Sequence, residues 1–231
     1  MKKLSIIIPV YNEQATITEL INKVKAVKLK NLTKEIIVVD DGSTDNSVQL
    51  IRLAQKKHSS LKTFSLPINL GKGAAIRLGL KHATGDIIII QDADLELNPQ
   101  EFHLLLEPIL TNKAKIVYGS RILGSHKIPF KSWLATKLTS GLTSLLYGQW
   151  ISDINTAYKA FTKSVNQKIS LRSVQFEFEA EFTAKVLKQG FKILEVPVSY
   201  HPRTQHEGKK IRFRDGLDLI FTIIKYRFIN D

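Results

Sequence analysis

Short apolar runs alternate with amphipathic segments over the first half of the chain. The runs at 5–10, 35–39 and 87–90 are almost entirely apolar, and a weaker run lies at 63–66. Runs of this length, rich in β-branched residues and without polar alternation, are typical of strands buried on both faces. The segments between them space apolar residues as a helix does, for example Ile17, Leu20, Ile21 and Val24. The pattern predicts an α/β fold, with a mostly parallel sheet that helices cover on both faces.

Two helix starts carry local signals. Thr16 and Glu19 have the spacing of a capping box ahead of an amphipathic segment. Asn98 precedes Pro99, and an asparagine cap followed by proline is a favoured way to begin a helix.

Polar residues follow each predicted strand at the point where the strand ends. They form the clusters Tyr11-Asn12-Glu13, Asp40-Asp41, Asn69 to Gly73, and Asp92-Ala93-Asp94. Parallel α/β sheets bind ligands at the carboxyl ends of their strands, so these clusters are expected on one rim. If the fourth strand continues past Gln91, Asp92 and Asp94 point to the same side and can share one cation. The alternative is a solvated turn that leads into the helix at Pro99.

Each rim residue has a chemical interpretation. Asp41 can accept the imide proton of a uracil or the ring N–H groups of a guanine, and Tyr11 can pack against a base or ribose. Lys72 stands between two glycines, where a backbone can approach a diphosphate and an ammonium can offset its charge. The alternative is that Asp41 only shapes a turn and Gly71 only ends a strand. The first strand lacks a following glycine fingerprint, which argues against a dinucleotide site.

Composition and charge narrow the partners. The 231 residues are 43% hydrophobic, enough for one sizeable core, and contain no cysteine, which excludes a disulfide framework and fits a reducing cytoplasm. The formal charge of +13 indicates a polyanionic partner: nucleic acid, an anionic membrane surface or phosphorylated small molecules. No zinc-finger, RNA-recognition or basic-zipper pattern favours nucleic acid.

No segment approaches the roughly 20 apolar residues of a spanning helix, so the chain is not expected to cross a membrane. Two stretches, 131–150 and 212–228, nevertheless place apolar residues among basic ones. Their apolar members are Trp133, Leu134, Leu138, Leu142, Leu145, Leu146 and Trp150, then Leu217, Ile220, Phe221, Ile224 and Phe228. Either stretch can dock on the cytoplasmic face of a membrane or on a membrane protein. The alternative is that both close the protein's own core or a homodimer.

The order of motifs resembles a known family. IIIPVYNE, IIVVDDGSTD, NLGKGAA, GDIIIIQDADLE and YGSR are similar to the catalytic domain of glycosyltransferase family 2, in particular the branch of dolichol-phosphate mannose and glucose synthases and bacterial polyprenyl-phosphate glycosyltransferases. The resemblance implies a GT-A fold, a Rossmann-like nucleotide-binding sheet plus a smaller acceptor-side region. It divides the chain into a nucleotide-sugar-binding half (1–121), an acceptor-side half (122–200), and a basic loop with a C-terminal amphipathic helix (201–231).

The resemblance also implies site residues. Nucleotide-sugar contacts would fall on Pro9, Tyr11, Glu13, Val39, Asp41, Lys72, Asp92, Ala93 and Asp94. The family's divalent cation, Mg²⁺ or Mn²⁺, would fall on Asp92 and Asp94. Glu96 stands where the mannose synthases usually have glutamine, and is a third acidic candidate for the metal.

The second half resembles the family more loosely. Arg121 corresponds to an arginine near the acceptor phosphate, and Arg203, Lys209 and Lys210 follow in a basic loop without the family's serine. Asp153 begins a segment in which Ala157 replaces the usual glycine, and Glu179 and Glu181 lie on the family's next helix. A lipid phosphate is already ionised near neutrality, so cations position it. A hydroxyl acceptor would need a base instead, and Asp153 is the candidate.

The predicted function is a metal-dependent, inverting glycosyltransferase that moves a sugar from UDP or GDP to polyprenyl phosphate at a membrane surface. One alternative is a family member that uses a soluble or polysaccharide hydroxyl. Non-enzyme alternatives are a basic nucleic-acid-binding module and a silent nucleotide-binding partner of a membrane protein. A nucleic-acid surface would favour lysine and arginine over aspartate on the rim, so no nucleic-acid partner is expected.

Overall fold

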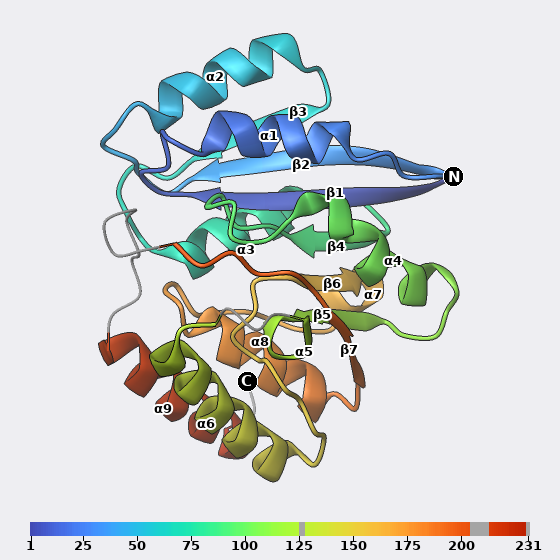
Figure 1. The fold of residues 1–231 in the computed structure, drawn as a ribbon, viewed down its shortest axis with the longest axis vertical. Coiled ribbons are helices and arrows are strands. Elements are labelled where there is room, and N and C mark those ends of the chain that lie inside the picture. Colours follow the sequence, from blue (N-terminus) through green and yellow to red (C-terminus); the bar gives the residue numbers. More distant parts are fainter. Residues whose placement is uncertain (125–127, 204–212, 230–231) are drawn as a thin grey trace.

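The structure is a computed structural model that describes residues 1–124, 128–203 and 213–229. Its centre is a seven-stranded sheet in the order β3-β2-β1-β4-β6-β5-β7 (Figure 1). The strands are β1 (Lys2–Val10), β2 (Leu32–Asp40), β3 (Leu61–Ser65), β4 (Ile87–Ile90), β5 (Ile116–Ser120), β6 (Lys159–Thr162) and β7 (Ile193–Pro197). β6 runs antiparallel to both of its neighbours, and the other described strand pairs are parallel. The predicted mostly parallel sheet is confirmed.

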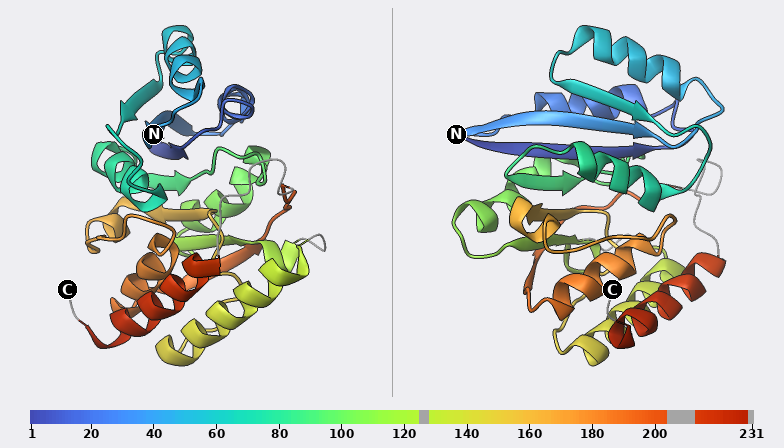
Figure 2. Two further views of the ribbon diagram at one scale, coloured as in Figure 1. Left: turned by 90° about the vertical axis from the view of Figure 1, so that its left-hand side faces the viewer. Right: turned by 180° about the vertical axis from the view of Figure 1, so that it is seen from behind.

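Helices cover both faces of the sheet, as predicted (Figures 1 and 2). Ile6 and Ile8 of β1 join the core formed with α1, α2 and α4, whereas Ile7 joins the core formed with α3, α8 and α9. The helices are α1 (Ile17–Ala26), α2 (Ser47–Lys57), α3 (Lys72–His82), η1 (Pro99–Glu101), α4 (Phe102–Leu110), α5 (Arg121–Gly124), α6 (Phe130–Tyr147), α7 (Lys163–Asn166), α8 (Phe178–Lys188) and α9 (Phe213–Phe228).

β4 has the predicted bounds, but it does not continue past Gln91. Its four isoleucines alternate between the two cores, which explains why the strand needs no polar position. The chain turns after Ile90, and Leu95 adopts a left-handed φ of 62°. The carboxylate of Asp94 accepts a hydrogen bond from the amide of Glu96 (3.1 Å), a local contact that favours a turn. The expected extended pair of aspartates is therefore wrong: Asp92 and Asp94 lie in a turn.

The two helix starts differ from each other. Thr16 makes no side-chain cap; its hydroxyl donates to the carboxylate of Glu13 (2.9 Å), so the predicted capping box with Glu19 is wrong. Asn98 does cap the next helix, because its side-chain oxygen accepts from the amide of Gln100 (3.1 Å).

Three helices of the second half of the chain, α6, α8 and α9, pack against one another, with α6 and α9 side by side (Figure 2). The helix α6 is unusual because it buries the hydroxyl residues Thr136, Thr139, Ser140 and Thr143. It exposes large apolar residues instead, with Leu138 61% and Leu145 81% exposed.

The expectation that the two amphipathic stretches close the protein's own core is met in part. Leu142 and Leu146 of α6 pack against the core, while Phe221 and Phe228 of α9 stay exposed. None of the described helices combines the length and the apolar character that crossing a bilayer requires.

Candidate active site

The carboxyl ends of β1, β2 and β4 lie side by side at one edge of the sheet. Pro9 is opposite Val39 in the β1–β2 register, and β4 pairs with the other side of β1. The side chains of Pro9, Val39 and Ala93 are buried, so these three present mainly their backbone to a ligand at the edge. Tyr11 and Glu13 follow β1 directly, and the predicted donor residues on these three elements therefore lie on one rim.

Asp41 is tied to the loop that precedes α3. Its two carboxylate oxygens accept hydrogen bonds from the amides of Leu70 (2.9 Å) and Gly71 (2.8 Å). Burial raises the pKa of Asp41, although the two amides oppose that shift. Asp41 thus shapes this turn in the structure, and its contact with a base stays a prediction.

Lys72, at the start of α3, is held between two carboxylates. Its ammonium lies 2.8 Å from Oδ1 of Asp92 and 3.1 Å from Oε1 of Glu179. Burial alone would lower the pKa of Lys72, but the two negative charges raise it above its ordinary value. The predicted donor-side lysine therefore contacts one of the two predicted metal ligands.

The glycines that flank Lys72 are required by the protein itself. A Cβ on Gly71 would lie 2.4 Å from the carbonyl oxygen of Val174, and one on Gly73 would lie 2.7 Å from that of Ser173. Segment 173–175 therefore occupies the space beside both glycines. The sequence predicts a diphosphate in that space.

Asp94 is the second rim aspartate. Burial first, and then the charges of Asp92 and Glu96, raise its pKa to about 7, while Arg203 opposes the shift. The guanidinium of Arg203 lies 3.4 Å from Asp94 and forms a two-pronged pair with Glu13 at 2.9 and 3.1 Å. The structure thus brings Glu13, Asp94 and Arg203 together, although Glu13 and Arg203 are 190 positions apart in the chain.

Glu96 holds the segment that carries Arg203. Its carboxylate accepts the amide of Arg203 (2.8 Å) and bonds the hydroxyl of Tyr200. Across residues 1–124, 128–203 and 213–229, no three His, Asp or Glu side chains gather as a ready-made metal cage. A preformed site of Asp92, Asp94 and Glu96 is therefore not what the structure contains, and Lys209 and Lys210 lie outside the described residues.

Asp92 and Asp94 nevertheless fit a divalent cation. Each carboxylate contacts a cation of the chain itself, Lys72 or Arg203, and burial first, then the charges of Asp92 and Glu96, raise the pKa of Asp94. Mg²⁺ and similar cations commonly use one or two carboxylates and take their remaining ligands from water and substrate phosphates. Two aspartates without a third protein ligand match that donor set.

Arg121 and Asp153, two residues predicted for the acceptor, form a buried ion pair. Arg121 follows β5, and its Nε and Nη2 bond the two carboxylate oxygens of Asp153 at 2.8 and 2.9 Å. Asp153 is fully buried and also accepts the amide of Arg121 (3.0 Å). The structure therefore brings together two residues that the sequence assigned to different roles.

Tyr200 connects this pair to the aspartate turn. The guanidinium of Arg121 lies 5.2 Å from the centre of the Tyr200 ring, and the hydroxyl of Tyr200 bonds Glu96. Burial raises the pKa of Tyr200, so its hydroxyl stays protonated at neutral pH. The residues predicted for the donor and those predicted for the acceptor thus belong to one connected set of contacts.

Two charged residues, the buried Lys159 and the half-buried Glu195, were not predicted for this region. Lys159 begins β6, is wholly buried and contacts Glu179. Glu195 of β7 accepts the amides of Ser152 (2.8 Å) and Asp153 (3.1 Å), which fixes the Asp153 loop. The signal for Lys159 was a single lysine inside an otherwise apolar strand; Glu195 sits in an alternating strand and carries no comparable signal.

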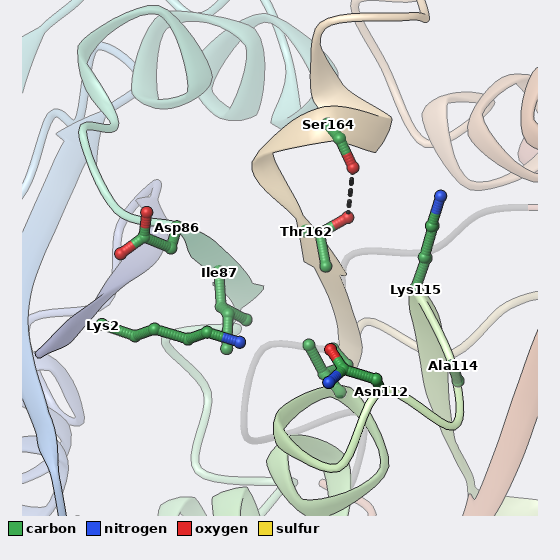
Figure 3. A pocket seen from close by; sticks show the side chains of 9 residues that line it. Lys2, Asp86, Ile87, Asn112, Ala114, Lys115, Thr162 and Ser164 are labelled. Carbon is green, nitrogen blue, oxygen red and sulfur yellow. Dashed lines mark hydrogen bonds between the residues drawn. The ribbon is translucent and has the colours of Figure 1, made fainter.

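A hollow of about 150 Å³ lies elsewhere, between the starts of β4 and β5 (Figure 3). Lys2, Asp86, Asn112, Lys115 and Thr162 are among its lining residues. Small-molecule sites usually span roughly 300–1,000 Å³, and this hollow is too small for a nucleotide sugar.

Comparison with known proteins shows the family of the chain. Residues 5–170 match the family described as Glycosyl transferase family 2. Dolichyl-phosphate beta-glucosyltransferase ALG5A of Trichomonas vaginalis is 27% identical over 238 residues, covering 96% of this chain and 72% of that protein.

Solved structures agree on the fold. Glucosyl-3-phosphoglycerate synthase from Mycobacterium tuberculosis, in complex with Mn²⁺, UDP and phosphoglyceric acid, superposes with a TM-score of 0.77 at 21% identity, covering 100% of this chain and 80% of that one. Its complex with Mn²⁺, UDP and glucosyl-3-phosphoglycerate gives a TM-score of 0.77 at 20% identity, with 100% and 81% coverage. The predicted GT-A fold is confirmed, and the chain belongs to glycosyl transferase family 2, which makes it a glycosyltransferase.

Proposed function

We propose that the enzyme transfers a sugar from a UDP- or GDP-sugar to a polyprenyl phosphate, with inversion at the anomeric carbon and with Mg²⁺ or Mn²⁺ as cofactor. The observation that carries the proposal is the rim itself: Asp92 and Asp94 lie in one turn beside two cations, Lys72 and Arg203. Such a rim suits a ligand with a diphosphate and a divalent cation.

On the donor side, Asp92 and Asp94 would hold the cation, which supplies positive charge to the departing diphosphate. Lys72 and Arg203 add two further positive charges at the same rim, and each is kept there by a second carboxylate, Glu179 or Glu13. The chain therefore brings its own cations to the place where negative charge develops in the reaction.

On the acceptor side, the state of Asp153 favours a phosphate. A general base needs a carboxylate that can reach and take a proton, but both oxygens of Asp153 already accept from Arg121. A phosphate monoester with a second pKa of about 6 needs no such base near neutrality. In this proposal Arg121 and Arg203 orient the acceptor phosphate by charge-assisted hydrogen bonds.

The name of the Trichomonas vaginalis relative supports a lipid phosphate acceptor, and the UDP and Mn²⁺ of the mycobacterial complexes support the donor class and the metal. A lipid acceptor places the enzyme at a membrane surface. The uncovered apolar residues of α6 and α9, with Lys131, Lys225 and Arg227 among them, suit a peripheral position on an anionic leaflet.

The test is a transfer assay with the full chain. UDP-glucose and GDP-mannose are each offered with Mn²⁺ or Mg²⁺, in the presence of a short polyprenyl phosphate or of 3-phosphoglycerate. We expect a lipid-linked sugar that requires the metal, and we expect Asp92→Ala and Asp94→Ala to lower its formation at least about a thousandfold. Glu107→Ala, which removes an exposed carboxylate from α4, is the control and should be as active as the parent.

Two results would overturn the proposal in different ways. Unchanged turnover by either aspartate variant would remove the metal site. Transfer to 3-phosphoglycerate and not to polyprenyl phosphate would leave the metal site intact and replace the lipid by a soluble acceptor.

A further inference from the structure

A line of alternating charges runs from the acceptor side to the donor side beneath the rim. Lys159 is wholly buried. Its ammonium donates hydrogen bonds to the carbonyl oxygens of Ile154 (3.0 Å) and Thr156 and to Oε2 of Glu179. The other oxygen of Glu179 lies 3.1 Å from the ammonium of Lys72. The order of charges is thus Lys159, Glu179, Lys72 and then Asp92.

Glu179 is not a rim residue and is not needed to balance a surface charge. It lies on α8, is 5% exposed, and its contacts are with two lysines from other elements, β6 and α3. Its Oε1 has no regular hydrogen bond among the described residues, even though Lys72 stands beside it. Lys72 donates its hydrogen bond to Asp92, and Oε1 of Glu179, 3.1 Å away, can accept one if Asp92 binds another cation.

We propose that Glu179 is the positioning residue for Lys72: it retains the ammonium at the rim when a divalent cation takes Asp92. This inference rests on the proposed metal site. A cation at Asp92 repels Lys72 and removes its closer partner. With Glu179 present, the ammonium keeps a carboxylate 3.1 Å away and stays near the departing diphosphate. Without Glu179, Asp92 is the remaining partner, so Lys72 competes with the metal for it.

Lys159 has a complementary role. It anchors Oε2 of Glu179, which leaves Oε1 as the oxygen that faces Lys72. Without Lys159, the full charge of Glu179 acts on Lys72 and draws it away from Asp92. Removal of Lys159 and removal of Glu179 therefore have opposite effects on the availability of Asp92, which a merely structural cluster would not produce.

The test measures Mn²⁺ binding alone, by electron paramagnetic resonance titration of the full chain without nucleotide. We expect Glu179→Gln to weaken Mn²⁺ binding about tenfold, a coupling of ordinary size for neighbouring charges. In a Lys72→Met background the same change should weaken it less than about twofold, because the competitor is gone. Lys159→Met should bind Mn²⁺ as tightly as the parent or more tightly.

Glu35→Gln is the matched control. Glu35 is also a buried glutamate between two lysines, Lys3 and Lys62, but it lies toward the starts of the strands, away from the rim. Its loss should leave Mn²⁺ binding unchanged. If Glu179→Gln fails to fold, the double change Glu179→Gln with Lys159→Met removes both buried charges and should weaken Mn²⁺ binding as the single change would.

The outcomes separate this inference from the function on which it rests. A parent protein that binds no Mn²⁺, either alone or after addition of UDP, overturns both; if UDP is needed for binding, all variants are compared with UDP present. A parent that binds Mn²⁺ while Glu179→Gln binds it equally well overturns the inference alone. Equal weakening in the parent and in the Lys72→Met background would also overturn it, since Glu179 would then act without Lys72.

Discussion

At the scale of single residues, the buried carboxylate of Glu35 contributes to stability and lies away from the rim. Glu35 lies toward the strand starts and is satisfied by Ser5, Lys62, Lys3 and Thr84. Burial alone would raise its pKa, but these hydrogen bonds and charges hold it well below its usual range. Glu35 therefore stabilises the folded chain in its ionised form.

The stability that Glu35 provides should depend on pH in a defined direction. A carboxyl whose pKa is depressed by folding stabilises the protein above its unfolded pKa of about 4.3, and this contribution is lost as the pH falls toward the folded pKa. Glu35→Gln should lower the free energy of unfolding at pH 7 by about 2 kcal/mol, and by clearly less at pH 3. Urea unfolding at both pH values measures this, and equal losses would contradict it.

Asp153 gives a prediction that distinguishes the two acceptor classes. Asp153→Asn keeps the shape of the side chain and removes the charge that faces Arg121. If the acceptor is a phosphate, transfer should persist, with its main loss in the Michaelis constant for the acceptor. If the acceptor is a hydroxyl, loss of the base should lower kcat about a hundredfold or more. Initial rates at varied acceptor, measured where thermal unfolding shows the variant to be folded, decide between the two.

The rim residues could be predicted from the sequence because each follows an apolar strand. Tyr11, Asp41 and Asp92 occur where a buried run meets a polar turn, and strand ends of a parallel sheet converge. Their partners could not be predicted in the same way. Arg203 reaches Glu13 across 190 positions of the chain, so that contact has no local signal. Lys159 is a lone lysine at the start of β6, and this pattern does not indicate its partner Glu179.

At the scale of elements, the start of α3 depends on a segment from the other half of the chain. Gly71 has a φ of +111°, and a Cβ there would also lie 2.5 Å from the side chain of Gln175. The amide of Ala74 bonds the carbonyl of Val174 (3.0 Å). The position of Lys72 is thus set by contact between α3 and residues 173–175, in addition to the turn itself.

Gly71→Ala tests that contact, with Gly190→Ala as its control. Both glycines have positive φ, so alanine is strained at either position, but the structure leaves open space around a Cβ at Gly190. Gly190→Ala should cost about 1 kcal/mol of unfolding free energy, and Gly71→Ala about 2 kcal/mol more, because the φ and ψ of Gly71 (111° and 162°) are essentially restricted to glycine and because the backbone of 173–175 must also shift. Urea unfolding measures the difference. Equal costs would mean that segment 173–175 yields freely and does not position Lys72.

The bounds of an element could be predicted from the sequence where burial of apolar side chains determines them. They could not be predicted where polar side chains form other hydrogen bonds than those expected. The four isoleucines of β4 specify a strand because each fits one of two cores. At Thr16, the hydroxyl bonds Glu13, so a motif with capping-box spacing does not cap. The turn after Ile90 likewise depends on the carboxylate of Asp94, which apolar periodicity does not record.

At the scale of the whole molecule, two helices of the second half, α6 and α9, leave large apolar side chains exposed. The second half adds the antiparallel strand β6 to the sheet and the helices α6, α8 and α9 beside it (Figure 1). The helix α6 buries hydroxyl groups and exposes Leu138 and Leu145, although Leu142 and Leu146 of the same helix pack against the core. The apolar pattern predicted the helix and its amphipathic character, but the direction of its apolar face became evident only in the fold.

These exposed leucines allow the proposed membrane docking to be tested. The electrostatic attraction of basic residues to an anionic leaflet is screened with a Debye length of about 10 Å at 0.1 M salt. The insertion of apolar side chains into the bilayer does not depend on salt in this way. The parent protein, with its formal charge of +13, should sediment with vesicles that contain anionic lipid, and about half or more of the bound fraction should remain at 0.5 M salt. Neutral vesicles should bind it more weakly.

Paired leucine changes assign that binding to a face. Leu138→Asp with Leu145→Asp on α6 should remove the salt-resistant fraction, because two charges are placed where apolar side chains enter the interface. Leu53→Asp is the matched control: Leu53 is 53% exposed on α2, on the other half of the molecule, and its change should leave vesicle binding as it was. Equal losses in the two variants would assign the effect to net charge, and no loss in either would leave the exposed face of α6 to a protein partner or a second copy of the chain.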